Sequence, residues 1–493
     1  MKTIIVLVRV LFVASEVAPF AKTGGLADVA GALPQALARR GHDVRIVMPS
    51  YDAIRHNGFD PAPVEPAMIG FDLGPQRVTA DIQGLDLGGV AVTLIDVPGL
   101  FRRGALYTDS PDDALRFATL GRAALEVCQR WQWAPDIVHC NDWQTALIPL
   151  YLRTLFADQP VFRTTKTVLT IHNLAYQGTF DAGVVPRLGL EPFRHLLDQA
   201  HLADGWVGFL ETGLIHADVL TTVSPTYAKE ITTPEYGFGL DEILRRRSGS
   251  LHGILNGIDT EVWNPATDRL LPFRYSAQSL WRKEWNKRGL LESAGLEYHE
   301  RVPVFGIVSR LVSHKGVGLL PRPLSGLLEA NDARFVGLGT GEPELEAGLN
   351  GLVDRFPGKA RFVAGYDEVL SHRIEGSVDV FLMPSQFEPS GLNQMYSLAY
   401  GTPPLVRRTG GLADTVQHWD PVAETGTGFV FEHYDEGGVW WALNQALAAM
   451  PDRAGWKRLQ LNGMAQDNSW DRAAAGYERV YEDLVAESRP GEP

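Results

Sequence analysis

Cysteine is almost absent from this chain of 493 residues, which contains only Cys128 and Cys140. A disulfide framework needs more cysteines, and neither residue has the closely spaced partners that a zinc site requires. We therefore expect two buried thiols in a reducing compartment. A convincing pair of metal-binding aspartates is also missing, so we expect neither a metal ion nor another cofactor.

Long apolar runs are missing as well, and positive charge is in the minority. The apolar stretch Met1–Ser15 is interrupted by Arg9 and followed at once by Glu16, so we interpret it as a buried strand with a few extra residues ahead. The chain has 45 Lys and Arg against 59 Asp and Glu, a net charge of −14. This balance argues against a nucleic-acid surface. We expect a cytoplasmic protein that binds neither nucleic acid nor membrane.

What the chain does contain is a regular alternation of strands and helices, in two series. Such alternation predicts an α/β protein of two doubly wound, Rossmann-like domains. We place them at residues 1–252 and 253–470, with an amphipathic helix at 471–493 that packs back on the first domain. The expected strands are Val10–Ala14, Asp43–Met48, Val90–Asp96, Ile137–Cys140, Lys166–Ile171, Val219–Val223, and then Val304–Val308, Arg334–Leu338, Ala360–Ala364, Val380–Pro384 and Pro404–Val406.

The hexapeptide Thr-Gly-Gly-Leu-Ala-Asp occurs twice, at Thr23–Asp28 and Thr409–Asp414, each time after a basic residue. A Gly-Gly pair lets backbone N–H groups turn toward a ligand, and a following helix start adds a positive dipole. Two such loops suggest a phosphorylated ligand or a sugar held between the domains. The alternative is that each Gly-Gly pair only marks a turn.

Polar clusters follow the expected strands of the first half. They include Glu16 with Lys22, then Asp142 with Trp143, and then His172 with Asn173. Ligands bind at the carboxyl ends of strands in open α/β sheets, so these clusters predict hydrogen bonding to a polyhydroxylated substrate. Loop capping is an equal alternative for the aspartate and the histidine, and a core position is one for the tryptophan.

The second half places basic and acidic groups at strand ends. Arg310 and Lys315 follow an apolar strand, where a guanidinium and an ammonium can grip a diphosphate. Glu388 precedes Ser390-Gly391-Leu392, which we expect to open a helix whose free N–H groups bind phosphate. A carboxylate there suits hydroxyl groups or a positive charge that develops in a transition state. Gly339-Thr-Gly341 lacks the third glycine of a dinucleotide fingerprint, and we interpret it as a tight turn.

These segments resemble bacterial glycogen synthases and plant starch synthases. The resemblance begins at Phe12–Val29 and spans nearly the whole chain, in order. It continues through Pro135–Trp143, Ile171–Gly178, Thr222–Ala228, Leu255–Asp259, Val308–Leu311, the Glu388 segment and Arg408–Thr415.

The resemblance implies a B-type glycosyltransferase fold with its active site between the domains. It also implies transfer of glucose from ADP-glucose to the non-reducing 4-OH of an α-1,4-glucan such as glycogen, with retention of configuration and without a metal. The catalytic residues would be Glu388, His172, Arg310, Lys315 and Asp142. The substrate-binding residues would be Lys22, Gly25, Glu16, Asn173, Asn256, Tyr366, Ser390, Gly391, Leu392, Thr409 and Gly410.

Within that set, the resemblance divides the roles. Lys22, Gly25, Arg310, Lys315, Gly391 and Leu392 would hold the donor phosphates, and Tyr366 would face the adenine. Glu388 would lie against the donor glucose. Asp142, His172, Asn173 and Asn256 would serve the glucose and acceptor side, with Glu16 near the acceptor.

The chain departs from the family pattern at several positions. Glu211 stands in place of Lys, and His314 in place of Gln. Gln386 and Ser390 replace Arg and Cys around the predicted catalytic carboxylate. Prolines at 321 and 323 fall where the family has a helix, so we expect distortion there and reduced activity. The alternatives are a synthase that prefers UDP-glucose and a weakly active, glucan-binding relative.

Overall fold

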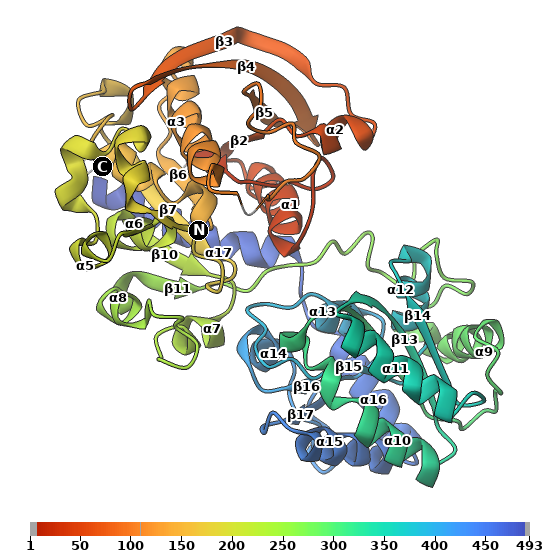
Figure 1. The fold of residues 1–493 in the computed structure, drawn as a ribbon. Helices are drawn as coiled ribbons and strands as arrows, with labels where there is room; N and C mark the ends of the chain where they lie inside the picture. Colours follow the sequence, from red (N-terminus) through yellow and green to blue (C-terminus); the bar gives the residue numbers. More distant parts are fainter. Residues whose placement is uncertain (1–6, 109, 489–493) are drawn as a thin grey trace. The chain divides into compact units, whose positions relative to one another are not determined.

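The computed structural model describes residues 7–108 and 110–488 (Figure 1). Residues 1–6, which include the extra segment expected ahead of the first strand, and 489–493 at the end of the expected C-terminal helix lie outside the described residues. The chain divides into two compact units. The first unit comprises Met1–Val223, Ala228–Gly257 and Trp470–Pro493, and the second comprises Ser224–Tyr227 and Ile258–Ser469.

A nine-stranded sheet forms the centre of the first unit, in the order β11-β10-β7-β6-β1-β2-β5-β4-β3. The strands from β11 to β5 in this order are parallel, and the inner ones are buried on both faces, as the apolar sequence predicts. Their bounds are β1 (Arg9–Val13), β2 (Asp43–Pro49), β3 (Ala62–Leu73), β4 (Gln76–Leu87), β5 (Val90–Asp96), β6 (Ile137–Asn141), β7 (Lys166–Ile171), β10 (Val219–Thr222) and β11 (Leu251–Gly253). A small antiparallel pair, β8 (Thr179–Asp181) and β9 (Trp206–Gly208), lies apart from this sheet.

The antiparallel edge of this sheet corrects the expectation of a purely parallel one. In the hairpin of β3 and β4, the long red-orange ribbon of Figure 1, β3 pairs antiparallel with β4, and β4 pairs antiparallel with β5. Both strands alternate between buried and exposed side chains and lack the continuous apolar run by which the other strands were identified. Only a period-two pattern could have predicted them.

Helices connect the strands and cover both faces of the sheet. In the first unit they are α1 (Gly25–Arg39), α2 (Asp52–His56), α3 (Asp113–Trp131), α4 (Ile148–Arg153), α5 (Gln199–Ala203), α6 (Phe209–His216), α8 (Asp241–Arg246) and α17 (Trp470–Ser488), while α7 (Pro225–Glu230) contains the change between units. The sequence after β6 also predicts one helix over Trp143–Leu155, whereas the structure has a 3₁₀ turn, Trp143–Thr145, followed by α4. Pro149 lies in the first turn of α4, where a proline displaces no helical hydrogen bond, and this favours a helix that begins there.

The C-terminal helix α17 belongs to the first unit, where it packs on α1 and β7. Its inward face is buried and carries Tyr477, Val480, Tyr481 and Leu484. Tyr481 Oη lies 2.6 Å from Nδ1 of His139, which is fully buried and therefore a core histidine. Burial lowers the pKa of His139 to about 3.

The second unit contains an entirely parallel six-stranded sheet in the order β14-β13-β12-β15-β16-β17. Its strands are β12 (Val304–Leu311), β13 (Arg334–Gly341), β14 (Ala360–Ala364), β15 (Val380–Met383), β16 (Pro404–Arg407) and the short β17 (Phe429–Phe431), which was not expected. Its helices are α9 (Lys283–Ser293), α10 (Pro321–Ala330), α11 (Pro343–Arg355), α12 (Glu368–Glu375), α13 (Asn393–Ala399), α14 (Gly410–Thr415), α15 (Glu436–Ala449) and α16 (Arg453–Met464).

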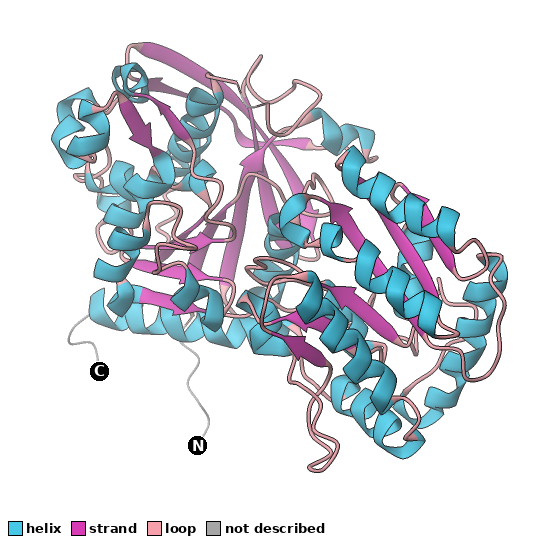
Figure 2. Cartoon of the chain, turned by 60° about the horizontal axis from the view of Figure 1, so that its bottom comes forward, coloured by secondary structure: helices cyan, strands magenta, loops and turns pink. Residues whose placement is uncertain are grey.

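Helices lie on both faces of this second sheet (Figure 2). Buried apolar side chains form one core on each face. Phe305 and Ile307 of β12 face a core shared with α10, α11 and α15, while Val304 faces one shared with α9 and α12. The expected distortion by Pro321 and Pro323 is wrong, because Pro321 is the first residue of α10. Prolines in the first turn displace no helical hydrogen bond.

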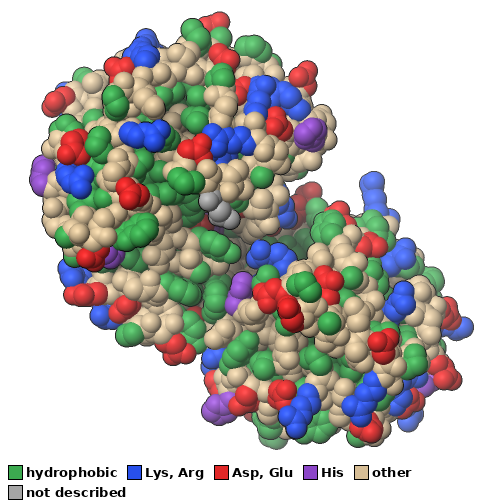
Figure 3. Space-filling model, in the orientation of Figure 1, with side chains coloured by type: hydrophobic (Ala, Val, Ile, Leu, Met, Phe, Trp, Pro, Cys, Tyr) green, Lys and Arg blue, Asp and Glu red, His purple; other side chains and the backbone are tan. Residues whose placement is uncertain are grey.

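Other expectations from composition concern the thiols, the surface and the membrane. Cys128 and Cys140 are buried and free, and burial raises the pKa of both thiols. Acidic and basic side chains are interspersed over the face of each unit that Figure 3 displays. Within residues 7–108 and 110–488, no helix has both the length and the apolar character to cross a membrane. The cytoplasmic location stays a prediction.

Candidate functional site

The strand order of the second sheet reverses between β12 and β15, which are neighbours. From β12 the chain continues outward to β13 and β14, and from β15 it continues the other way to β16 and β17. Such a switch point is the place where open α/β sheets bind ligands, because the loops after the two strands diverge there. Arg310 lies near the end of β12 and Lys315 in the loop that follows it, while the loop after β15 carries Glu388.

Glu388 is paired at this point with a cation. Its Oε2 atom accepts hydrogen bonds from Lys315 Nζ (2.6 Å) and from Ser385 Oγ (3.0 Å). The carboxylate is only 7% exposed and the lysine side chain 21% exposed. The site therefore holds a carboxylate and an ammonium group whose charges neutralise each other, and the lysine side chain remains accessible to solvent.

Tight packing between the two loops fixes this pair. A Cβ atom on Gly316, whose φ is +69°, would lie 2.0 Å from the carbonyl oxygen of Pro384, so only glycine fits. The N–H of Gln386 donates to the carbonyl of His314 (2.8 Å), and the ring of His314 stacks on Phe387 with centroids 4.8 Å apart. Desolvation, followed by the charge of Lys315, lowers the pKa of His314.

The second hexapeptide lies against the loop that carries Glu388. The N–H of Gly411 donates to the carbonyl of Glu388 (3.0 Å), and Thr409 is fully buried. A Cβ atom on Gly410 would lie 2.0 Å from the Glu388 carbonyl oxygen, and one on Gly411 would lie 1.9 Å from that of Ser390. These glycines therefore position the loop that carries Glu388, while direct ligand contact by Thr409 and Gly410 stays a prediction.

The remaining predicted donor residues lie at the same edge of the second sheet. Arg310 is exposed, and within the described part of the chain its guanidinium has no hydrogen-bonding or ionic partner. Tyr366, just beyond β14, is 87% exposed. Gly391 and Leu392 immediately precede α13, which begins at Asn393, so the expected helix start is present. Ser390 is buried, and its Oγ donates to the carbonyl of Gly391 (3.3 Å).

The first unit has its own switch point, between β1 and β6. Asp142, which follows β6, has a φ of +55°, and its Oδ1 atom accepts from the N–H of His172 after β7 (2.7 Å). His172 Nε2 lies 2.9 Å from Asn141 Oδ1. The loop-capping alternative therefore holds for Asp142. The same hydrogen bond brings two of the predicted polar residues, Asp142 and His172, together.

Burial shifts the titration of these groups. Desolvation raises the pKa of Asp142 to about 7, although N–H groups of His172 and Asn173 oppose the shift, and the nearby Glu16 adds to it. Desolvation lowers the pKa of His172 to about 3, so its imidazole is neutral at pH 7. Asn173 holds its loop through Oδ1, which accepts from the N–H of Ala175 (3.0 Å).

Glu16 organises the first hexapeptide. Its Oε2 atom accepts from both the N–H (2.5 Å) and the Oγ1 (2.9 Å) of Thr23, and burial raises its pKa. Lys22 is half exposed and pairs with Asp28 (2.6 Å). A Cβ atom on Gly25 would meet nothing within 4 Å. The first hexapeptide thus has open space in front of its glycine, unlike the second.

Asn256, the last predicted residue of the first unit, follows β11 and is 8% exposed. Its Oδ1 atom has no hydrogen-bond partner among residues 7–108 and 110–488. A buried amide oxygen without a hydrogen-bond partner is costly, so this position suits a ligand that donates a hydrogen bond to it.

Some residues have a structural role instead, and others escaped prediction. Trp143 packs edge-on against Phe117 (4.9 Å), which favours the core alternative. Glu211 is buried and bonded to His201 Nδ1 (2.8 Å). Ser385 and Tyr107 were missed. The position of Ser385, three residues before Glu388, is only a weak signal in the sequence. The Tyr107 hydroxyl lies 2.8 Å from Ser15 Oγ, and nothing in the sequence links these two residues.

Comparison with known families gives a consistent result for the two halves of the chain. The starch synthase catalytic domain family matches residues 9–246, and the family of group 1 glycosyl transferases matches residues 292–458. The glycogen synthase of Anaeromyxobacter sp. (strain Fw109-5) is 47% identical over 485 residues, which are 97% of this chain and 100% of that protein. The glycogen synthase of Koribacter versatilis (strain Ellin345) is 44% identical over 96% of this chain and 98% of that protein.

Among solved structures, the catalytic domain of starch synthase IV from Arabidopsis thaliana bound to ADP and acarbose is similar, with a TM-score of 0.87 and 35% identity. The match covers 98% of this chain and 100% of that one. The expected fold, two Rossmann-like domains of the B type of glycosyltransferases, is confirmed, as is the resemblance noted from the motifs. The chain therefore belongs to the glycogen synthase and starch synthase family of retaining glycosyltransferases.

Proposed function

We propose that this glycosyltransferase moves glucose from ADP-glucose to the non-reducing 4-OH of an α-1,4-glucan, glycogen in particular, without a metal ion. The observation that carries the proposal is the pairing of Glu388 with Lys315 at the switch point of the second sheet. The pair supplies a carboxylate for the sugar and a cation for the diphosphate. The Arabidopsis relative, solved with ADP and acarbose, supports a nucleoside diphosphate and an oligosaccharide as ligands of this fold.

The leaving group requires positive charge, and two cations of the second unit can supply it. ADP departs with growing negative charge, which Arg310 and Lys315 would stabilise as magnesium does in other transferases. N–H groups at Gly391 and Leu392, just before α13, would bind the same phosphates. We assign Lys22 and Gly25 of the first unit to these phosphates as well, and the exposed ring of Tyr366 to the adenine.

Donor binding would change the environment of Glu388. In the structure Lys315 Nζ forms an ion pair with Glu388 Oε2 at 2.6 Å. A diphosphate competes for the ammonium, so the carboxylate becomes free to act on the donor glucose as positive charge develops at its anomeric carbon. Ser385 would keep the carboxylate oriented throughout.

Bond making and breaking would occur on one face of the sugar. The bond from the anomeric carbon to the ADP oxygen breaks, the bond to the acceptor O4 forms, and the acceptor proton passes to the departing phosphate oxygen. Configuration is then retained. We favour this front-face attack over a covalent intermediate, because no carboxylate of the chain is an obvious nucleophile.

The first unit would supply the glucose and acceptor contacts. A neutral His172 can exchange a hydrogen bond with a sugar hydroxyl without adding charge. Asp142 titrates near pH 7 and can accept from a hydroxyl when ionised. The free Oδ1 of Asn256 would accept from a hydroxyl, with Asn173 and Glu16 completing the polar lining.

The test is transfer of labelled glucose into glycogen from ADP-glucose and, separately, from UDP-glucose, each with and without EDTA. We expect incorporation from ADP-glucose at least about tenfold faster than from UDP-glucose, and unchanged by EDTA. Faster use of UDP-glucose would overturn the donor assignment. Loss of activity in EDTA would overturn the metal-independent mechanism, and no incorporation from either donor would leave only a glucan-binding relative.

A further inference from the structure

The segment that enters α9 reverses the usual distribution of polar and apolar side chains. Trp281 and Trp285, one turn apart, are 60% and 43% exposed. Lys283 and Lys287, on the opposite face, are 5% and 3% exposed. Burying an ammonium group is costly, and an exposed indole gains nothing from the hydrophobic effect. Hydrophobicity alone would therefore favour the opposite orientation of this segment.

Buried polar contacts hold the helix in this orientation. Lys283 Nζ donates to Thr402 Oγ1 (2.6 Å), and Lys287 Nζ pairs with Asp379 Oδ2 (2.8 Å). Leu290 and Leu291, further along α9, pack in the core beside β12. Trp285 thus lies on a helix anchored by these contacts, and Trp281 lies on the 3₁₀ turn Ala277–Arg282 that leads into it.

A third aromatic ring joins them from the preceding segment. Phe273, 43% exposed, lies edge-on to Trp285 with centroids 5.2 Å apart, and Trp285 lies edge-on to Trp281 at 4.8 Å. We call these three rings the 273/281/285 patch. The guanidinium of Arg282 lies 5.5 Å from the ring centre of Trp281 and adds hydrogen-bond donors to the patch.

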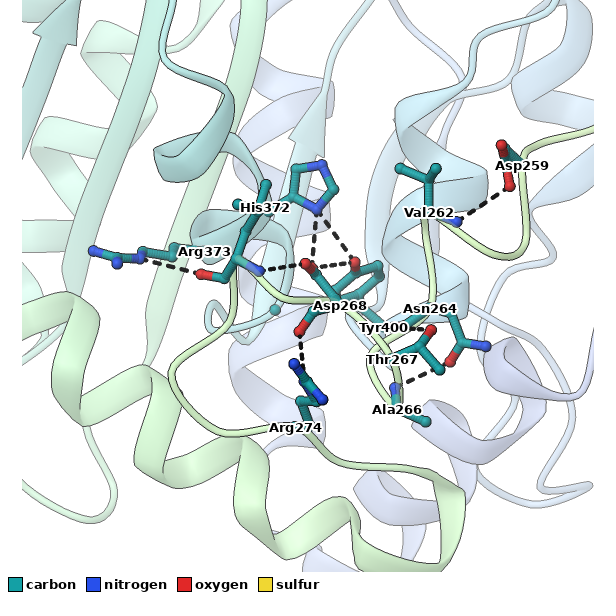
Figure 4. A network of polar contacts seen from close by, with 12 residues as sticks. Asp259, Val262, Asn264, Ala266, Thr267, Asp268, Arg274, His372, Arg373 and Tyr400 are labelled. Carbon is teal, nitrogen blue, oxygen red and sulfur yellow. Dashed lines mark hydrogen bonds and ion pairs between the residues drawn. The ribbon is translucent and has the colours of Figure 1, made fainter.

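The backbone of Phe273 is fixed on both sides. Asn286, buried in α9, accepts from its N–H (3.0 Å) and donates to its carbonyl (2.7 Å). The neighbouring Arg274 donates through Nε to the carbonyl of Asp268 (3.1 Å), and the Asp268 carboxylate is held by His372 and Tyr400 (Figure 4). A preorganised surface loses little entropy when it binds a ligand.

We infer that the 273/281/285 patch is a glucan-binding surface, outside the residues proposed for catalysis, that captures α-1,4-glucan chains. The inference rests on the proposed function, because that function supplies a polymer as the substrate. Exposed aromatic rings contact the apolar faces of sugar rings, and a neighbouring guanidinium bonds hydroxyl groups.

The size of the patch favours a glucan over a second copy of the chain. Three partly exposed rings offer about 300 Å² of apolar surface if each ring contributes the share of its ~150–250 Å² that remains uncovered. A stable protein partner needs about 800 Å² on each side. A chain of a few glucose units needs far less, and repeated capture along a branched polymer multiplies a weak contact.

The test compares Trp281→Ala/Trp285→Ala with the matched control Trp440→Ala, which removes an indole that is 40% exposed on α15. Affinity for glycogen is measured without donor, by retardation in gels that contain glycogen. We expect the double variant to lose at least about tenfold in affinity and the control to change less than twofold. With donor, the KM for glycogen rises in the double variant, while transfer to maltotriose keeps its kcat within twofold.

Two further measurements keep the inference falsifiable. Trp281→Phe/Trp285→Phe retains the aromatic surface and keeps most of the affinity, and the single variant Trp281→Ser, at the most exposed ring, loses part of it even if the double alanine variant does not fold. The inference is overturned if Trp281→Ser binds glycogen with unchanged affinity. It is also overturned if the substitutions change the oligomeric state and leave the affinity for glycogen unchanged. Glycogen binding through the patch by a protein that transfers no glucose would leave this inference intact and refute the proposed function.

Discussion

Replacing Glu388 with alanine is expected to lower kcat by about 10²–10³-fold or more, while the affinity for ADP stays the same or increases. The carboxylate is nearly buried and bonded to Lys315 and Ser385, so its loss removes the group proposed to face the donor glucose. The same change frees Lys315 from its 2.6 Å ion pair and leaves the ammonium available to the diphosphate. Steady-state kinetics with ADP-glucose and calorimetric titration with ADP measure the two effects.

The controls separate chemistry from folding. Glu388→Gln keeps the volume and should be nearly as inactive, whereas Ser385→Ala keeps the carboxylate and should lose less than about tenfold. Thermal unfolding of each variant shows whether the fold persists. A variant Glu388→Ala that folds yet loses ADP affinity by tenfold would contradict the assigned role, as would one that retains a tenth of the kcat.

The two hexapeptides are expected to respond in opposite ways to the same substitution. Gly410→Ala and Gly411→Ala should each lower the free energy of unfolding by at least about 3 kcal/mol. The added Cβ would lie 2.0 Å and 1.9 Å from backbone oxygens of the Glu388 loop, and the φ of +42° at Gly410 adds strain. Because backbone atoms cannot turn aside as a flexible side chain does, the loop itself must move.

Gly25→Ala is the matched control in the first hexapeptide. Its Cβ would meet nothing within 4 Å, and alanine suits the first residue of α1 better than glycine does. We expect the free energy of unfolding to change by less than about 1 kcal/mol, in the stabilising direction. Chemical denaturation of the three variants measures the contrast. Equal destabilisation at Gly25 and Gly411 would refute the different roles of the two loops.

The sequence predicted the parallel part of the fold because buried parallel strands leave an unmistakable apolar run. Val90–Asp96, Lys166–Ile171 and Ala360–Ala364 have the predicted bounds in the structure. The β3–β4 hairpin was missed, because its strands are half exposed and have no such run. Pro149 was overlooked as a helix boundary, and Pro321 was overrated as a disruption, since position within the first turn decides what a proline does.

The candidate site could be predicted only as a set of strand ends. Reading polar residues after apolar strands brings Lys315 and Glu388 to one edge of a sheet, and the structure shows them in contact. The sequence pattern could not predict that the charges of Lys315 and Glu388 neutralise each other, because their contact depends on how two loops pack through Gly316 and His314. The identical hexapeptides likewise carry no local signal that one is open and the other packed.

The most direct test of the central claim is the nuclear magnetic resonance spectrum of the product formed from maltotetraose and ADP-glucose labelled with ¹³C at the anomeric carbon. We expect a single new labelled signal from an α-linked glucose at the non-reducing end, joined to O4 of the acceptor. A β-linked product, or labelled free glucose released by water in place of transfer, would contradict it.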